Sequence, residues 1–548
     1  MARRGAARRG AGRRAGHTRA GARASALAVA AVLAAATVGG CATNTEPDRP
    51  EAGGTGSAAG PTGSARPPAP DPKSGLPAAL TGQKLVWKEC APPTKAQGNE
   101  AQRPGREWQC ATAEVPLDYA APKGETLGIA LVRARATGGD DKRIGSLLFN
   151  FGGPGGSGVA SLPQMGDLFA ALRERYDLVG FDPRGVAESS EVVCRDDKET
   201  DVSLALDSTP DTPAEERAYF ADAKAFGEGC AKRSGKILPH VGTDDAARDL
   251  DVLRQVLGDR RLHYFGFSYG TELGGVYAHL FPGKVGRLVM DAVVDPSADG
   301  VAGARNQALG FQRALDNYSR SSGASAEAGT DRVRRLLDRL DRKPLPASGG
   351  RELTQSLALT GIIAPLYSKE SWPALTRALK AAEDGDGTLL LLLADSYNDR
   401  DSQGHYSTAH HSQRAISCAD TAARPTAEQV RATHLADFRK VSPVFGPFLA
   451  WDLAGWCASW PVRGAHTDTD VSAPGSAPVL VVGGTGDPAT PFEGSQRMAE
   501  ELGKGVGVHV TFRGEGHGAY PTGNACVVRT VNAYLLDGRI PAAGTVCS

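Results

Sequence analysis

The sequence predicts an α/β protein in which a mostly parallel, doubly wound sheet carries a large helical insert. Three observations predict this class. Short apolar strands alternate with helical stretches between residues 144 and 296, helical patterns alone occupy about 297 to 473, and the alternation resumes at residue 477. Near-continuous apolar strands separated by helices are typical of a parallel sheet that is covered on both faces.

The first 40 residues predict a secretory signal peptide. They hold eight arginines and no acidic residue, and an apolar Ala/Val/Leu segment follows at 24–38, which is the pattern of a basic n-region and a short h-region. The letters VGGC at 38–41 are similar to the lipobox of bacterial lipoproteins, in which the cysteine thiol carries diacylglycerol. We therefore expect an exported protein that is lipid-anchored through Cys41 at the extracellular face of the cell membrane. If Cys41 is an ordinary thiol, the protein is secreted without an anchor. The paired arginines leave the export route open.

Residues 41–80 predict a flexible tether, because they are rich in Gly, Ser, Pro, Ala and Thr and show no apolar periodicity. The 62 Lys and Arg less the eight arginines of residues 1–40 leave 54 against 62 Asp and Glu, a net charge of −8. A mildly acidic body makes nucleic acid an unexpected partner. No later stretch is long and apolar enough to span a bilayer, so membrane contact is expected only through the anchor.

Nine cysteines are present, and eight remain when Cys41 is set aside. An even number in an exported chain favours disulfides over metal ligation. Neighbours in the sequence suggest the pairs Cys90–Cys110, Cys194–Cys230, Cys418–Cys457 and Cys526–Cys547. Eight cysteines allow 105 connectivities, however, and the sequence does not choose among them. There is no CxxC pair, and the adjacent His410 and His411 are expected on the surface, so we expect neither a metal nor another cofactor.

Residues 81–296 are expected to form the first part of the α/β unit. Its apolar runs predict strands at 146–151, 176–182, 261–267 and 286–294. One crossover helix can be predicted closely, with Thr243 as its N-cap, two aspartates in its first turn and Gly258 at its end. One face of that helix is apolar and carries Leu250, Leu253 and Leu257.

Residues 297–473 are predicted to be a helical cap inserted after the sixth strand. Two sets of apolar residues recur at helical spacing, Val333, Leu336, Leu337 and Leu340 in the first and Trp372, Leu375 and Leu379 in the second. Residues 474–548 are expected to complete the α/β unit. Strands are predicted at 477–484 and 507–512, each followed by a helical stretch.

The segment GFSYG, residues 266–270, places Ser268 at the turn between a predicted strand and a predicted helix. It has the G-x-S-x-G form of a nucleophile elbow, whose strained turn holds the serine hydroxyl at the top of the sheet. Side chains at Gly266 or Gly270 would collide with the strand and the helix. In a chain with 68 glycines, a turn that carries this pattern by chance is the alternative.

Two later residues suit the base and the acid that a serine nucleophile needs. Asp487 follows one late predicted strand and His517 follows the next, in the order Ser, Asp, His that is expected of hydrolases with this elbow. We therefore assign Ser268, Asp487 and His517 to a catalytic triad. A solvated loop histidine is the alternative for His517.

Further groups around the predicted triad come from two loops. The glycine-rich segment 150–158 follows a predicted strand, and its backbone can approach a substrate closely. We assign the oxyanion hole to the backbone N–H groups of Gly153 and Tyr269. A phosphate-binding loop is disfavoured, because no GK[ST] sequence or dinucleotide fingerprint is present. Thr490 is expected to cap the helix after Asp487, in a capping box with Glu493.

With these residues, the chain resembles the proline-iminopeptidase-type α/β-hydrolases and, among them, the tripeptidyl aminopeptidase-like secreted serine peptidases of actinomycetes. The matching motifs follow the family's order from about residue 85 to the end. They are GGPGGSG (152–158), GFDPRGVAES (180–189), GFSYGTELG (266–274), AISCAD (415–420), WCASWP (456–461), GGTGDPATP (483–491) and GEGHGAY (514–520). Phe151 departs from the pattern, since many relatives carry histidine there. We expect Phe151 to change the orientation of the loop. The oxyanion donors themselves are retained, because they are backbone N–H groups.

The resemblance implies the α/β-hydrolase fold and a serine exopeptidase that removes short peptides, often tripeptides, from free N-termini. Its substrates would be peptides, and the helical cap would limit access to the site. Such specificity needs a carboxylate for the substrate's ammonium group. Asp420 in the cap and Glu272, one helical turn beyond Ser268, are the candidates, and each is equally suited to a structural ion pair.

Two other functions remain open from the sequence. A carboxylesterase or lipase would use the same triad, because the pocket and not the fold decides the substrate. A lipid-anchored binding protein of the cell envelope would carry a vestigial site, although the complete triad and the intact glycine loop argue against it. Epoxide hydrolases and dehalogenases of this fold are disfavoured, because their elbow carries aspartate.

Overall fold

The protein is described by a computed structural model that covers residues 76–98, 101–465 and 469–548. The predicted signal peptide, Cys41 and the tether up to residue 75 lie outside the described residues. The last predicted tether residues are ordered, since they enter the short helix α1 (Ala78–Thr81). Within the described ranges, no helix has the length and apolar character that a membrane crossing requires.

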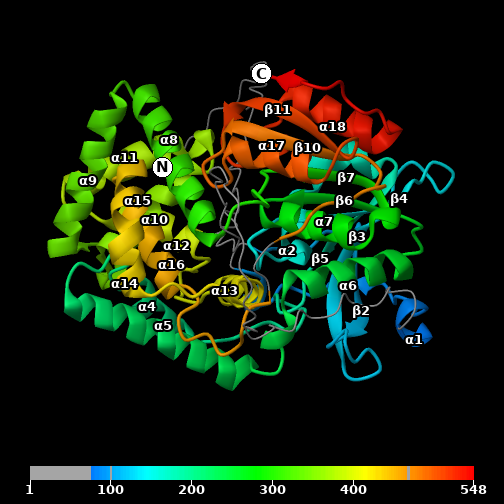
Figure 1. Cartoon of the computed structure of the whole chain (residues 1–548), viewed down its shortest axis with the longest axis horizontal. Coiled ribbons are helices and arrows are strands. Elements are labelled where there is room, and N and C mark those ends of the chain that lie inside the picture. The colour runs from blue at the N-terminus through cyan, green and yellow to red at the C-terminus, as the bar shows by residue number, and fades with distance from the viewer. Residues whose placement is uncertain (1–75, 99–100, 466–468) are drawn as a thin grey trace, which may run out of the picture.

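A sheet of ten strands forms the centre of the α/β part (Figure 1), in the order β1-β2-β3-β5-β4-β6-β7-β10-β11-β12. The six central strands run parallel, as predicted, and are β5 (Tyr176–Phe181), β4 (Gly145–Asn150), β6 (Leu262–Phe267), β7 (Val285–Asp291), β10 (Val479–Gly486) and β11 (Gly507–Glu515). Every residue of β4 and β5 is buried. This is expected for parallel strands with helices on both faces.

The edges of the sheet are the part that the apolar runs did not predict. β2 (Trp108–Pro116) and β3 (Thr126–Ala134) pair antiparallel with each other, and β3 joins the parallel strands by an antiparallel pairing with β5. Short strands β1 (Lys88–Glu89) and β12 (Val546–Cys547) lie at the two ends of the sheet. Burial along β2 and β3 is interrupted by exposed residues, so these strands lack the continuous apolar run of a central strand.

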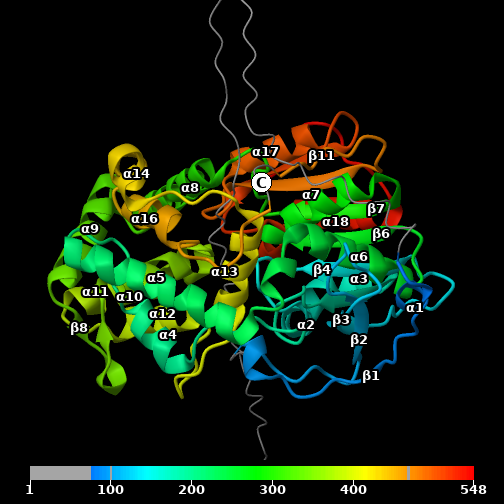
Figure 2. The ribbon, with the colours of Figure 1, turned by 60° about the horizontal axis from the view of Figure 1, so that its bottom comes forward.

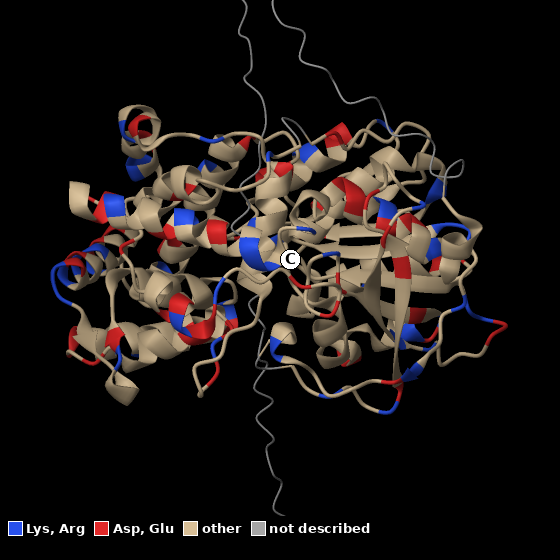
Figure 3. Cartoon of the chain, turned by 90° about the horizontal axis from the view of Figure 1, so that it is seen from below, with Lys and Arg blue, Asp and Glu red and all other residues tan. Residues whose placement is uncertain are grey.

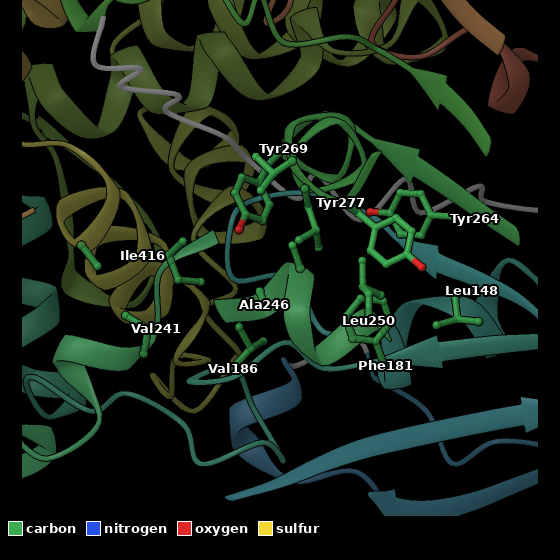
Figure 4. Packing of buried hydrophobic residues seen from close by; sticks show 14 of the residues in the cluster. Leu148, Phe181, Val186, Val241, Ala246, Leu250, Tyr264, Tyr269, Tyr277 and Ile416 are labelled. Carbon is green, nitrogen blue, oxygen red and sulfur yellow. The ribbon is translucent and has the colours of Figure 1, made fainter. Parts of the chain in front are cut away.

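Helices cover both faces of the sheet and give each face its own apolar core. One face is covered by α6 (Thr243–Val256), α7 (Tyr269–Leu280) and α17 (Phe492–Glu501), and the other by α2 (Gly158–Gln164), α3 (Ala170–Arg173) and α18 (Ala525–Asp537). Alternate residues of β6 point to opposite faces, so that Tyr264 packs with the first core and Phe265 with the second. Figure 4 shows Tyr264 close to Leu250 of α6.

The helical cap begins after β7, which is the seventh strand when the two-residue β1 is counted. Its helices of seven or more residues are α8 (Gly300–Ser321), α9 (Ala326–Arg342), α10 (Gln355–Leu366), α11 (Trp372–Glu383), α12 (Thr388–Tyr397), α13 (Ala409–Asp420), α15 (Leu435–Val441) and α16 (Gly446–Gly455). The apolar residues predicted at helical spacing are buried in a separate core of the cap. The cap therefore has its own hydrophobic centre.

Two helices from the first α/β segment also pack on the cap. α4 (Asp197–Leu204) and α5 (Pro213–Ser234) run along the bottom of the cap in Figure 1, and α5 contacts α16. The Ser208 backbone N–H donates to Ser356 Oγ at 2.9 Å, and the Tyr219 hydroxyl donates to the Trp451 carbonyl at 3.2 Å. The cap is thus built from two separate stretches of the chain. The domain boundaries drawn from the sequence stay predictions.

Helix α13 lies between the cap and the α/β part in both views (Figures 1 and 2). Its Ile416 belongs to the α/β core together with Val241 and Ala246 (Figure 4). Each of the four cysteine pairs suggested by sequence proximity is a disulfide, namely Cys90–Cys110, Cys194–Cys230, Cys418–Cys457 and Cys526–Cys547. The third of them ties the end of α13 to the segment that follows α16.

Candidate active site

Ser268 stands at the turn between β6 and α7 with φ 55° and ψ −125°, a backbone conformation that costs a non-glycine residue free energy. A Cβ atom on Gly266 would lie 2.3 Å from the carbonyl oxygen of Gly270. A Cβ atom on Gly270 would lie 2.8 Å from the carbonyl oxygen of Asn150, at the end of β4. Neither position has room for a side chain, because backbone atoms lie too close. At Gly266 the close atom belongs to the turn, and at Gly270 it belongs to the neighbouring strand β4.

Asp487, in the loop after β10, holds the imidazole of His517. Its two carboxylate oxygens lie 2.9 and 3.1 Å from His517 Nδ1. The carboxylate also accepts backbone N–H groups from Ala489 at 3.0 Å, Thr490 at 2.9 Å and Gly518 at 3.3 Å. The side chain of Asp487 is only 1% exposed, so these donors fix its orientation away from solvent. The contact makes Nδ1 the protonated nitrogen of the neutral ring and leaves Nε2 as the proton acceptor.

The capping box predicted at Thr490 does not form. Helix α17 begins at Phe492 without a side-chain cap, and Glu493 instead pairs with Arg313 of the cap at 2.8 Å. The backbone N–H of Thr490 donates to the Asp487 carboxylate, and Pro491 holds the N-cap position of α17. Its hydroxyl lies 3.4 Å from His517 Nδ1. Thr490 thus supports the acid and the base directly.

Ser268 Oγ and His517 Nε2 are both buried, and neither atom has a hydrogen-bond partner among the described residues. One is the hydroxyl that a base would deprotonate and the other is the nitrogen that would accept the proton. Within the described ranges, no other group competes for either atom. Catalytic hydrogen bonds are often long in a site without substrate and shorten when substrate binds.

Asp291, which was not predicted, joins the elbow to the loop that carries His517. Its backbone carbonyl accepts the N–H of Ser268 at 3.1 Å. Its carboxylate accepts the N–H groups of Ala519 at 2.8 Å and Tyr520 at 2.7 Å. Burial raises the pKa of Asp291 to about 6, although these hydrogen bonds oppose the rise. An aspartate at the end of an apolar strand was the sequence signal for this link.

The glycine-rich loop approaches the elbow at Gly152, the residue before the predicted oxyanion donor Gly153. A Cβ atom on Gly152, whose φ is +91°, would lie 2.8 Å from the Cβ of Ser268 and 3.3 Å from the backbone nitrogen of Tyr269. Tyr269 is the first residue of α7, so its N–H has no partner within the helix. Gly153 follows in the same loop with φ +113°. A helix N-terminus beside a flexible glycine backbone favours developing negative charge.

Phe151, the departure from the family pattern, packs away from these donors. Its ring stacks on Phe267 with centroids 5.8 Å apart and on Phe149 at 6.0 Å. Gly152 is held separately, because its N–H donates to the Asn150 side-chain oxygen at 2.9 Å. The aromatic side chain therefore anchors the loop to the core on the sheet face that carries α2 and α18.

Asp420 caps helix α6 across the interface between the cap and the α/β part. Its carboxylate accepts the backbone N–H of Thr243 at 2.8 Å and the Thr243 hydroxyl at 2.7 Å. Thr243 was predicted as the N-cap, but it is the first helical residue and Gly242 holds the N-cap position. The cap is supplied by a residue 177 positions away, which local sequence does not reveal.

Glu272, the other predicted ligand of a substrate ammonium group, lies near Asp420. Burial, and after it the negative charge of Asp420, raise the pKa of Glu272 to about 8. The Thr469 hydroxyl is 3.5 Å from Glu272. Both predicted carboxylates therefore already have protein partners.

Of the adjacent histidines, His410 is exposed, as predicted, but His411 is not. His411 is 5% exposed, and its ring packs on Phe226 with centroids 5.5 Å apart. The prediction failed for His411 because α13 is buried between the cap and the α/β part. In the described ranges, no group of three or more His, Cys, Asp or Glu residues is arranged to hold a metal ion.

The cap contacts both the base and the glycine-rich loop. The carbonyl of Tyr367, at the end of α10, accepts the N–H of His517 at 2.8 Å, and the two rings are nearly perpendicular with centroids 5.2 Å apart. A Cβ atom on Gly155 would lie 2.5 Å from the carbonyl oxygen of Ala409, in α13. No predicted motif pointed to Tyr367. The cap is therefore part of the site and not only a lid over it.

Comparisons with known proteins give the relatives of this chain. Residues 442–547 match a family described as TAP-like protein. The chain is 37% identical over 490 residues to the serine protease Hip1 of Mycobacterium tuberculosis, covering 85% of this chain and 91% of the relative. It is 33% identical over 488 residues to the tripeptidyl aminopeptidase of Streptomyces lividans, covering 85% and 86%. It is 36% identical over 460 residues to a Mycobacterium tuberculosis carboxylesterase B, covering 81% and 87%. Among solved structures, a Thermogutta terrifontis esterase is 12% identical with a TM-score of 0.34, covering 77% of this chain and 96% of that chain.

Proposed function

The chain belongs to the tripeptidyl aminopeptidase-like serine peptidases with the α/β-hydrolase fold, and from this premise we propose that it is an exported exopeptidase that releases short peptides, tripeptides among them, from free N-termini. The single observation that carries the proposal is the buried Asp487–His517 pair, in a chain whose strained elbow carries Ser268. A helical cap contacts the same histidine.

In the proposed mechanism, Ser268 Oγ attacks the carbonyl carbon of the scissile peptide bond. His517 Nε2 accepts the serine proton and then donates it to the leaving amine, while Asp487 stabilises the imidazolium through Nδ1. The negative oxygen of the tetrahedral intermediate accepts the N–H groups of Gly153 and Tyr269. The peptide left on Ser268 is an acyl ester. Water, deprotonated by His517, hydrolyses that ester and restores the enzyme.

Export is proposed from the basic and apolar N-terminus and from the lipobox-like VGGC that contains Cys41. Four disulfides support it, because such bonds persist in oxidising compartments outside the cytosol. Lipidation of Cys41 would place the peptidase at the extracellular face of the membrane. The 41–80 segment would then act as its tether.

The test of the proposed activity is mass spectrometry of the products formed from a mixed peptide library. We expect short fragments from the free N-terminus, with tripeptides prominent, and no cleavage of N-acetylated copies. Internal cleavage, or equal cleavage of acetylated peptides, would contradict an aminopeptidase. The same assay reports product length without a prior choice of substrate.

An esterase is the second candidate, because one relative of similar identity is named carboxylesterase B. The triad serves both chemistries. Tripeptidyl anilides and nitrophenyl esters distinguish the two functions. We expect a larger kcat/KM for the tripeptidyl anilide. Turnover of esters alone would favour the esterase.

A further inference from the structure

Tyr269, the residue after Ser268, is held by its side chain as well as by helix α7. Its ring is buried, and its hydroxyl lies 2.6 Å from Oγ1 of Thr243, the first residue of α6. The Thr243 hydroxyl donates its one proton to Asp420 Oδ2 at 2.7 Å, because a carboxylate only accepts. The Tyr269 hydroxyl is therefore the donor to Thr243 Oγ1. These three side chains form one directed chain of hydrogen bonds, called here the Tyr269 relay.

Asp420 fixes the far end of the relay. Its Oδ1 accepts the backbone N–H of Thr243 at 2.8 Å, so both carboxylate oxygens bind the same threonine. Asp420 is the last residue of α13, and the disulfide Cys418–Cys457 begins two residues before it. The Arg424 guanidinium also donates to the Cys418 carbonyl at 3.0 Å. The carboxylate thus belongs to a helix end that a disulfide and a hydrogen bond fix in place.

The elbow needs such support, because Ser268 has a strained backbone conformation. Strain of this kind persists only where surrounding contacts hold it. The Ser268 carbonyl accepts the Thr271 hydroxyl at 2.7 Å, and the Gly270 carbonyl accepts the Tyr264 hydroxyl at 2.7 Å. Tyr269 lies between these two residues, and the relay is the side-chain contact that holds it.

The side chain of Tyr269 limits where its backbone N–H can lie. A tyrosine ring is rigid, and only two torsion angles separate it from the backbone. Burial, and after it the negative charge of Asp420, raise the pKa of Tyr269 well above its ordinary value of 10, so the phenol keeps the proton that it donates. A hydroxyl fixed at one end of a rigid side chain therefore restricts the N–H group at the other end.

Helix α13 also contacts the loop that carries the other predicted donor, Gly153. A Cβ atom on Gly155 would lie 2.5 Å from the carbonyl oxygen of Ala409, the first residue of α13. The last residue of the same helix, Asp420, holds the Tyr269 relay. One helix of the cap thus contacts the segments of both predicted oxyanion donors.

We propose that Thr243 and Asp420 are positioning residues that hold the backbone N–H of Tyr269 in place for the oxyanion. Both act through Tyr269, without contact to the reacting atoms. The inference rests on the proposed serine mechanism and adds that the cap supports its oxyanion hole. This role differs from the ammonium ligand that the sequence led us to expect at Asp420.

The experiment compares Thr243→Val, Tyr269→Phe and the double variant with the wild type on a tripeptidyl anilide. Each single variant removes one hydroxyl of the relay and leaves the N–H of residue 269 in place. Loss of a whole oxyanion donor lowers kcat about 10²- to 10³-fold, so a displaced donor should lower it roughly 5- to 20-fold, with KM nearly unchanged. The double variant should be no slower than the slower single variant, because both substitutions break the same hydrogen bond.

The rate of fluorophosphonate labelling is a second readout. The phosphoryl oxygen of the probe accepts the same N–H groups when Ser268 attacks phosphorus, whereas the probe has no peptide to bind. The labelling rate should therefore fall by a factor similar to that of kcat. Thr243→Ser keeps the hydroxyl and should restore both values. If Thr243→Val fails to accumulate, Tyr269→Phe, which leaves the cap of α6 intact, gives the same measurement.

Thr200→Val is the matched control. Thr200 is also buried, and its hydroxyl donates to the Asp196 carbonyl at 2.8 Å in α4, a helix that packs on the cap. This variant tests whether the loss of any buried threonine hydroxyl is enough. It should keep the kcat and the labelling rate of the wild type.

The outcomes separate the two proposals. Unchanged kcat and labelling rates in Tyr269→Phe and Thr243→Val would overturn the positioning role. Losses that multiply in the double variant, or an equal loss in Thr200→Val, would overturn it as well. A labelled wild type that cleaves no peptide would refute the peptidase function alone, because the labelling rates still test the relay. A wild type that is not labelled would refute both.

Discussion

At the scale of single residues, Asp487 holds the imidazole of His517 by hydrogen bonds. Three backbone N–H groups and the imidazole of His517 surround this carboxylate. The contact fixes which imidazole nitrogen carries the proton, and Nε2 has no hydrogen-bond partner among the described residues. A side chain of the same shape without the charge would keep the packing and lose this control.

The first prediction concerns Asp487→Asn. An asparagine amide can donate to Nδ1 and favours the wrong tautomer of His517, so kcat should fall by about 10⁴-fold, the size of effect known for triads of this kind. Turnover of a tripeptidyl anilide measures it. Asp437→Asn, which removes an exposed partner of Arg305, should change kcat little. Retention of kcat to within about tenfold would show that Asp487 is not the orienting acid.

A second prediction concerns Glu272 and pH. The folded-state pKa of about 8 lies above the ordinary value of 4.5, so the folded protein holds this proton more tightly than the unfolded chain. Its contribution to stability is present below about pH 4.5 and is lost as the pH rises through 8. Glu272→Gln should therefore gain stability relative to the wild type between pH 5 and pH 9.

Thermal unfolding of the two proteins at pH 5 and pH 9 measures this difference. The exposed Glu327 provides the control, since Glu327→Gln should follow the wild type across the same interval. If Tm falls by the same amount between pH 5 and pH 9 in Glu272→Gln and in the wild type, the pKa of Glu272 is not raised.

At the scale of elements, the glycine-rich loop packs closely on helix α13. Gly155 has φ +101°, and a Cβ atom there would lie 2.5 Å from the Ala409 carbonyl oxygen and 2.9 Å from the Gln413 nitrogen. The loop that carries the predicted donor Gly153 is thus held between the elbow and a cap helix. We therefore expect the position of α13 to affect the predicted oxyanion donor Gly153.

The third prediction is that Gly155→Ala lowers kcat/KM for a tripeptidyl anilide at least about tenfold, because the added methyl group displaces the loop from α13. Gly258→Ala is the matched control. Gly258 also has positive φ, at +83°, but nothing lies within 4 Å of its Cβ position, so only backbone strain is added. If the two folded variants have equal kcat/KM values, the contact between the loop and α13 does not affect catalysis.

Elements with strong local patterns could be predicted from the sequence. The parallel strands are continuous apolar runs, and the leucines of α9 recur at helical spacing, so both appear in the printed sequence. Gly258 closes α6 in a left-handed conformation, as predicted, but neither predicted N-cap is correct. Asp420 caps α6 from 177 positions away, and Asp487 engages the backbone of Thr490. Both contacts exist only after the chain has folded.

The candidate site likewise contains residues that a local pattern predicts and residues that only the folded structure reveals. Ser268, Asp487 and His517 each follow a parallel strand, so the pattern predicts the same edge of the sheet for all three. Asp291 and Tyr367 carry no motif. Their importance comes from what the fold places beside them.

The two-part construction of the cap is the main feature at the scale of the whole molecule. Helices α4 and α5 join the insert, and α13 connects the cap to the α/β part, so access to the site depends on contacts between distant segments. Viewed from below, basic and acidic residues are interspersed over both parts (Figure 3). The proposed attachment to a membrane is through Cys41 in the N-terminal segment.

A fourth prediction follows for attachment. Cys41→Ser removes the thiol that would carry lipid, so the enzyme should move from the membrane fraction to the medium. Its specific activity should be unchanged, because residue 41 precedes the folded body. Fractionation followed by anilide turnover measures both quantities. A wild type already found wholly in the medium, with an unmodified N-terminus, would refute the anchor.

The most direct test of the central claim is fluorophosphonate labelling followed by peptide mapping and a tripeptidyl anilide assay. We expect one label, located on Ser268, and loss of anilide turnover in proportion to labelling. Ser268→Ala should remain unlabelled and inactive. A label on another residue, or full turnover by Ser268→Ala, would contradict a serine peptidase built on this elbow.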